Sequence, residues 1–153
     1  MRLLYGHDAA VEKFIAERVP GCPDGFGASL CVGVINKDGL LIAGWAWHGW
    51  NPHAGTIEFS GASLTPKWMT RAILHELFSY AFNTINCQMI QTRNSVSNVR
   101  LHRQLSDYGF TRFDVPRLFG RNEDGVFWTL TDTDWKQSRY YGKAEGSHAP
   151  KPN

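Results

Sequence analysis

Two cationic side chains near the start of an expected helix could hold an anion. Thr65-Pro66 is typical of a helix start, with a hydroxyl cap and a proline at the first helical position. Lys67 and Arg71 then fall in the first two turns. Cations there oppose the helix dipole, at a cost of about a few tenths of a kcal/mol each, unless an anion binds the backbone N–H groups. The segment therefore predicts a phosphate or pyrophosphate site, although an ordinary helix with solvated cations has the same pattern.

Glu58 is the carboxylate best placed to move a proton. Residues 56–64 alternate between apolar and polar positions, as in a half-buried strand, and Glu58 lies on the polar side just before the anion site. A carboxylate there could take a proton from a nucleophile, directly or through a water. His48 and His53 flank the turn before this strand and are the alternative bases. Each of the three could instead be an ordinary surface or structural residue.

The elements that would position these residues alternate in type along the chain. The sequence predicts strands near residues 3–5, 28–35, 40–48, 56–64, 88–92, 111–114 and 126–131, and helices near residues 8–19, 65–81 and 98–108. Because the strand–helix–strand unit at 56–92 needs a crossover between parallel strands, we expect a mixed sheet with helices on both faces. We therefore predict one α/β domain over residues 1–135. The polar segment 136–153 has no periodicity and is expected to be a flexible tail.

The composition excludes several classes of protein. The chain of 153 residues carries 16 basic and 14 acidic side chains, a net charge of +2, which argues against a dominant nucleic-acid partner. The three cysteines, Cys22, Cys31 and Cys87, are widely spaced, so we expect free thiols and no metal site. The N-terminal segment is too polar for a signal peptide, and no apolar run approaches the roughly 20 residues that cross a bilayer. The expected location is the cytoplasm, without membrane contact.

Two short runs of residues match motifs of a known family. Residues 67–72 (KWMTRA) follow a strand, and Asn98 is followed eleven residues later by Gly109-Phe110. Together with the element order, these runs resemble the GNAT N-acetyltransferase superfamily, particularly its ribosomal-protein-acetyltransferase-like members and small members from phage and prophage genomes. In that family a Gln/Arg-x-x-Gly-x-Gly/Ala loop holds the coenzyme A pyrophosphate. Here Thr70 stands at the central glycine, and Leu105 stands where a tyrosine often serves as general acid.

The resemblance implies a GNAT-like three-layer fold, with a central, largely antiparallel twisted sheet, and acetyl-CoA as co-substrate without a metal. It implies direct transfer of the acetyl group to an amine, with Glu58, His48 and His53 as candidate bases and a strand N–H near residues 62–64 as oxyanion donor. The implied coenzyme-binding residues are Ala62, Ser63, Leu64, Lys67, Thr70, Arg71, Ala72, Asn94 and Asn98.

Two other functions remain open from the sequence. Thr70 and Leu105 would suit a module that binds acyl-CoA or a partner without catalysis. The aromatic run around Trp45, Trp47 and Trp50, with the arginines of residues 112–121, would suit a phage-type enzyme that modifies nucleic-acid bases. For Trp45 and Trp47 themselves we expect packing in the core, and an aromatic wall for an acceptor is the alternative.

Overall fold

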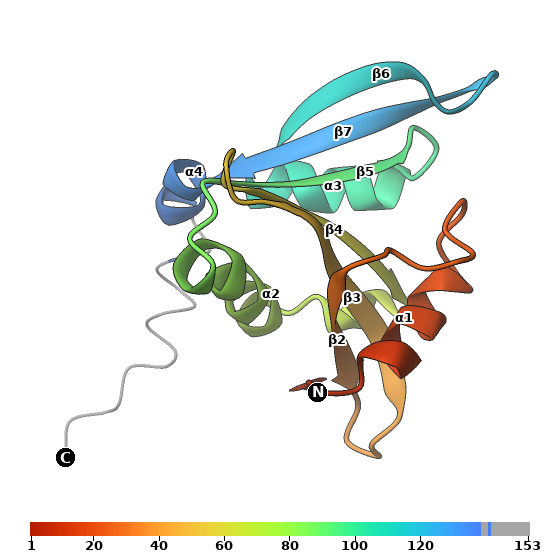
Figure 1. Cartoon of the computed structure of the whole chain (residues 1–153), viewed down its shortest axis with the longest axis vertical. Coiled ribbons are helices and arrows are strands. Elements are labelled where there is room, and N and C mark those ends of the chain that lie inside the picture. The colour runs from red at the N-terminus through yellow and green to blue at the C-terminus, as the bar shows by residue number, and fades with distance from the viewer. Residues whose placement is uncertain (139–140, 142–153) are drawn as a thin grey trace.

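Seven strands form one sheet in the order β1-β2-β3-β4-β5-β7-β6 (Figure 1). This computed structural model describes residues 1–138 and 141. The strands are β1 (Arg2–Leu4), β2 (Ser29–Ile35), β3 (Leu41–Asn51), β4 (Thr56–Ser63), β5 (Met89–Ser95), β6 (Thr111–Gly120) and β7 (Glu123–Thr131). The helices are α1 (Asp8–Ala16), α2 (Arg71–Ser79), α3 (Val99–Tyr108) and α4 (Asp132–Gln137). Only β4 and β5 run parallel among the paired strands of the described chain, so the mixed, largely antiparallel sheet is confirmed.

Helix α1 covers one face of the N-terminal half of the sheet (Figure 1). Val11 and Ile15 from this helix are fully buried against β2 and β3. Gly44 lies beneath the helix, where a Cβ atom would come within 2.8 Å of the Ile15 side chain. The absence of a side chain at Gly44 therefore lets α1 lie close to the strand.

Helices α2 and α3 lie on the opposite face, which completes the three layers. Trp45 stacks on Phe59 at 4.3 Å between ring centroids, and Phe78 of α2 meets Tyr108 of α3 at 5.0 Å. Trp45 and Trp47 are buried, so their expected packing in the core is confirmed. Aromatic rings thus join both helices to the sheet through one hydrophobic core.

The expected start of α2 is wrong by five residues. Thr65 does cap a turn, because its hydroxyl accepts a hydrogen bond from the Lys67 N–H at 3.3 Å, but that turn is a short 3-10 helix over Pro66–Trp68. The α-helix starts at Arg71, where the Thr70 hydroxyl accepts from the Ile73 N–H at 3.2 Å. Lys67 therefore lies before the helix rather than in its first turn.

The end of the described chain contains a helix that the sequence patterns did not predict. Helix α4 crosses the expected domain boundary at residue 135, and Trp135 within it is fully buried. Its ring stacks on Phe82 at 4.9 Å and meets Tyr141 at 4.6 Å. The remaining residues of the expected tail, 139–140 and 142–153, lie outside the described residues.

Candidate acyl-coenzyme A site

Strands β4 and β5 pair over a short stretch and then part. The pairs are Thr56–Met89, Ile57–Ile90 and Glu58–Gln91. The Thr92 hydroxyl adds a last link, donating to the Phe59 carbonyl at 2.9 Å. Beyond it β4 continues beside β3 as far as Ser63, and β5 continues beside β7 as far as Ser95. The facing edges of β4 and β5 therefore separate where they leave the pair.

A cleft of about 1210 Å³ occupies this opening. Its walls are residues 60–64 of the β4 edge and residues 92–95 of the β5 edge, and its floor includes Trp45, Phe59 and Phe78. The lining also includes Arg71 at the start of α2, residues 18–21, which follow α1, and Phe119 and Glu123 of the β6–β7 hairpin. The cleft can thus hold a long, flexible ligand with an anionic end.

Some backbone N–H groups at the end of β4 form hydrogen bonds to β3, and others point towards the cleft. The Leu64 N–H donates to the Ile42 carbonyl of β3 at 2.8 Å, so Leu64 cannot supply the expected oxyanion donor. N–H groups alternate in direction along a strand, so those of Gly61 and Ser63 point to the β5 side. The Phe59 carbonyl, which accepts from Thr92, points the same way. Ser63 therefore remains a candidate donor, and the sequence reasoning missed Gly61.

Only one of the four residues of the 67–72 run that were expected to bind the anion lines the cleft. Arg71 stands at the first position of α2 and lines the cleft, whereas Lys67, Thr70 and Ala72 do not. Lys67 and Ala72 are exposed. Thr70 has φ −74° and ψ 156°, an extended conformation that does not require glycine. The start of α2 thus directs its positive dipole end and one arginine towards the cleft.

Asn94 and Asn98 both line the cleft. Asn94 is only 9% exposed, and no described residue bonds its buried Oδ1 atom. A buried amide oxygen without a donor is costly, so a ligand N–H or a water is expected there. Ala62, Ser63 and Leu64 line the opposite wall.

Glu58 belongs to a polar cluster behind the cleft. It is only 9% exposed, and its Oε1 accepts hydrogen bonds from Arg93 Nη2 at 2.8 Å and Nε at 3.2 Å. Its Oε2 lies 3.8 Å from His48 Nε2, which is 2.9 Å from Ser60 Oγ. Of these residues only Ser60 and Arg93 line the cleft. Sequence reasoning missed both, although each occupies an alternate polar position on the face of Glu58.

The two candidate histidines differ in their surroundings. His48 stacks on Phe26 with ring centroids 4.9 Å apart. Burial lowers the pKa of His48 below its usual value; Glu58 opposes this shift and Arg93 adds to it. The imidazole is therefore neutral at pH 7 and can accept a proton. His53 is exposed on the turn before β4 and does not line the cleft, so it is not brought together with the other candidates.

The position expected for a tyrosine acid carries no proton donor. Leu105 is 3% exposed, and it lines the cleft beside Phe78. Tyr108, one turn later on α3, also lines the cleft and is largely buried. A phenol therefore reaches the cleft from a position that the spacing did not indicate.

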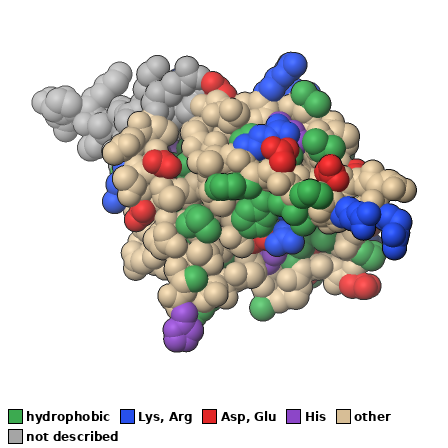
Figure 2. All heavy atoms as spheres, turned by 90° about the horizontal axis from the view of Figure 1, so that it is seen from above, with side chains coloured by type: hydrophobic (Ala, Val, Ile, Leu, Met, Phe, Trp, Pro, Cys, Tyr) green, Lys and Arg blue, Asp and Glu red, His purple; other side chains and the backbone are tan. Residues whose placement is uncertain are grey.

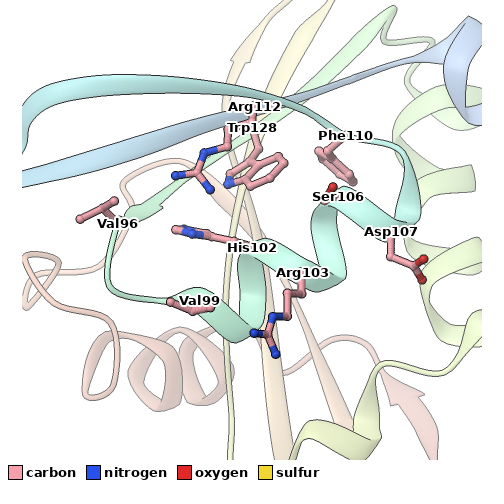
Figure 3. Close-up of a pocket in the computed structure, with 9 residues that line it drawn as sticks. All are labelled: Val96, Val99, His102, Arg103, Ser106, Asp107, Phe110, Arg112 and Trp128. Carbon is pink, nitrogen blue, oxygen red and sulfur yellow. The ribbon is translucent and has the colours of Figure 1, made fainter.

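A second cavity, of about 700 Å³, lies on the other side of α3 (Figure 3). His102, Arg112 and Trp128 gather along one side of it in Figure 3. Burial lowers the pKa of His102, with a smaller effect of Arg112 in the same direction. None of the expected site residues lines this cavity. Phe110 and Asp107 border both cavities, so α3 and Phe110 separate this cavity from the cleft.

The described part of the chain offers neither a metal site nor a membrane-spanning helix. No group of three or more His, Cys, Asp or Glu side chains there could hold a metal ion. None of the described helices has the length and apolar character to span a membrane. The three cysteines form no disulfide.

The fold is similar to that of solved acetyltransferases, although no family model and no curated protein matches the sequence. A putative acetyltransferase superposes with a TM-score of 0.74 at 16% identity, over 96% of this chain and 93% of that chain. Variant forms of the spermidine/spermine N-acetyltransferase SpeG from Vibrio cholerae give 0.72 at 14% identity, over 89% and 97%.

Some matches cover less of the other protein. A GCN5-related N-acetyltransferase from Brucella melitensis gives a TM-score of 0.64 at 21% identity, over 80% of this chain and 58% of that chain. The chain spans 65% of a probable acetyltransferase that matches with a TM-score of 0.61. At these identities the likeness concerns the fold alone. The chain therefore has the mixed α/β fold of the GNAT acetyltransferases.

Proposed function

We propose that the protein transfers an acetyl group from acetyl-CoA to the amine of an acceptor. The observation that carries this proposal is the cleft between the parted strands, which leads to the positive end of α2. The fold of solved acetyltransferases supports it. The spermidine acetyltransferases among those structures do not identify the acceptor here.

The coenzyme would lie along the cleft with its pyrophosphate near Arg71. The helix dipole and the guanidinium both favour an anion there. The pantetheine chain contains amide groups that can pair with strand edges. Between β4 and β5 it would meet the N–H groups of Gly61 and Ser63 on one side and the buried Oδ1 of Asn94 on the other.

The reaction would be a direct attack of the amine nitrogen on the thioester carbonyl. A tetrahedral intermediate places negative charge on the carbonyl oxygen, and a β4 N–H that points into the cleft would stabilise it. The amine must lose a proton, and the cluster of Glu58 and His48 supplies candidate bases next to the cleft. The departing thiolate takes its proton from water or from a cleft residue.

The test is the release of coenzyme A thiol from acetyl-CoA in the presence of a panel of amines. The panel should include polyamines, amino acids, amino sugars and peptides with free N-termini. The proposal predicts thiol release that depends on one class of amine, with the acetylated amine detected by mass spectrometry. Absence of acetylated product across the panel, with acetyl-CoA bound, would contradict it.

A binding module without catalysis is the second candidate. Leu105 provides no proton donor, and Arg93 already holds Glu58 in an ion pair. Such a module would bind acetyl-CoA and coenzyme A with similar affinity and leave every amine unchanged. Calorimetric titrations beside the amine panel separate the two functions.

A further inference from the structure

We propose that Ser60 and His48 form the proton route out of the acceptor site, with Ser60 as the relay at the cleft and His48 as the base behind it. The inference rests on the proposed acetyl transfer and assigns its proton path. Ser60 lines the cleft, and its Oγ lies 2.9 Å from His48 Nε2. His48 and Glu58 do not line the cleft, so a proton from a bound amine reaches them through Ser60.

Glu58 is poorly placed to take the proton itself. Its Oε1 accepts both hydrogen bonds from Arg93, and its Oε2 lies 3.8 Å from His48 Nε2. The two carboxylate oxygens are thus engaged by Arg93 and His48, and Glu58 does not line the cleft where the amine would bind. Glu58 therefore acts as a positioning residue, and its Oε2 at 3.8 Å stabilises the imidazolium that forms on His48.

The same geometry argues against Ser60 as a nucleophile. In a serine–histidine–carboxylate triad the carboxylate holds the imidazole nitrogen opposite the serine. Here Ser60 and Glu58 both approach Nε2 of His48. Ser60 therefore passes a proton and does not become acylated.

The step balances without an additional reactant. The amine nitrogen bonds to the thioester carbon while its proton goes to Ser60 Oγ and the Ser60 proton goes to His48 Nε2. Collapse of the intermediate breaks the C–S bond, and the thiolate takes the electron pair. The imidazolium then gives its proton to solvent or to the thiolate. The net products are the acetylated amine and coenzyme A.

The charges around His48 give this route a distinctive pH dependence. Glu58 from β4 and Arg93 from β5 are the charged groups that act on the ring, while β2 presents Ser29 and the preceding loop presents Phe26. Burial and Arg93 lower the pKa of His48, and Glu58 raises it. A neutral His48 is the active form, so kcat/KM should fall as the pH drops through this pKa. Arg93→Gln should move that acid limb to higher pH, and Glu58→Gln should move it to lower pH without removing it.

The experiment measures kcat, KM and the pH profile for the accepted amine, with acetyl-CoA affinity from calorimetry as a check of folding. We expect His48→Gln to lower kcat by about 10²–10⁴-fold and Ser60→Ala by about tenfold or more, with coenzyme affinity unchanged. Ser60→Thr keeps a hydroxyl and should restore most of the rate. Ser106→Ala, an exposed serine on α3, is the matched control and should behave as wild type.

Two results would overturn the relay while leaving acetyl transfer standing. One is a Ser60→Ala variant with the wild-type rate and pH profile. The other is loss of the acid limb in Glu58→Gln, which would make Glu58 the base. If wild-type protein binds acetyl-CoA but acetylates none of the amines, the proposed function fails and the relay with it.

Discussion

Lys67 and Arg71 are four residues apart, and the start of α2 determines which of these two cations lies at the helix end. Both could bind an anion there if the helix began at Thr65. Because α2 begins at Arg71, only the arginine combines the helix end with a place in the cleft lining. Lys67 is exposed on the preceding 3-10 turn, where its charge is screened by solvent.

Charge reversal at these two positions should therefore have unequal effects. We expect Arg71→Glu to weaken coenzyme A binding by about tenfold or more, because a carboxylate would face the pyrophosphate at the helix end. Lys67→Glu is the matched control and should change the affinity by about threefold or less. Calorimetry at low and at physiological salt measures both. Equal losses for the two variants would move the anion site away from the start of α2.

At the scale of elements, the segment before α2 contains two N-cap residues, Thr65 and Thr70. Thr65 caps a turn that stops after Trp68, since Met69 adopts φ −78° and ψ 62° and leaves the helical region. Thr70 then caps the helix that continues. The 3-10 turn therefore places Thr65, Pro66 and Met69 in the cleft lining, while the helix axis starts at Arg71.

Thr70 should matter for the stability of α2 more than for ligand binding. Thr70→Ala removes the hydroxyl that accepts from Ile73 and should lower the free energy of unfolding by about 1 kcal/mol, whereas Thr70→Gly should cost only about a few tenths. Thermal or urea unfolding measures the loss. Coenzyme A affinity should stay the same or increase in Thr70→Gly. A large loss of affinity in a folded Thr70→Gly variant would show that the hydroxyl contacts the ligand.

The sequence patterns predicted most elements because strand alternation and helical spacing are local properties. The order of the strands and longer helices, the parallel crossover from β4 to β5 and the end of α3 at Tyr108 are all confirmed. The partners of Glu58 were not predictable, because Arg93 is 35 residues away and meets it only through the register of β4 and β5. Helix α4 is too short for a periodic pattern, and its single buried tryptophan gives no period.

At the scale of the whole molecule, the cleft results from competition between strand pairs. β4 keeps its hydrogen bonds to β3, and β5 keeps its hydrogen bonds to β7 along its full length, so β4 and β5 do not pair beyond their first residues.

On the side of the sheet opposite α3, the face formed by β5, β7 and β6 carries hydrophobic side chains among charged ones. A view from above shows the hydrophobic side chains gathered at the centre of this face (Figure 2). Phe113 on this face is 51% exposed.

Helix α4 should be part of the stable core rather than an appendage. Trp135→Ala removes a fully buried ring that stacks on Phe82, and we expect a loss of about 3–5 kcal/mol in the free energy of unfolding. Trp50→Ala is the matched control, because Trp50 is 46% exposed, and should change the free energy by about 0.5 kcal/mol or less. Urea unfolding followed by circular dichroism compares them. A loss at Trp135 as small as that at Trp50 would make α4 dispensable.

The central claim is that acetyl-CoA occupies the opening between β4 and β5, and a crystal structure with coenzyme A bound tests it most directly. We expect the pyrophosphate at the start of α2 beside Arg71, the pantetheine between residues 60–64 and 92–95, and the thiol near Ser60. Asn94 Oδ1 should gain a hydrogen-bond donor from the ligand or from an ordered water. Coenzyme A bound elsewhere, for instance in the cavity beyond α3, or no binding at millimolar ligand, would contradict the account.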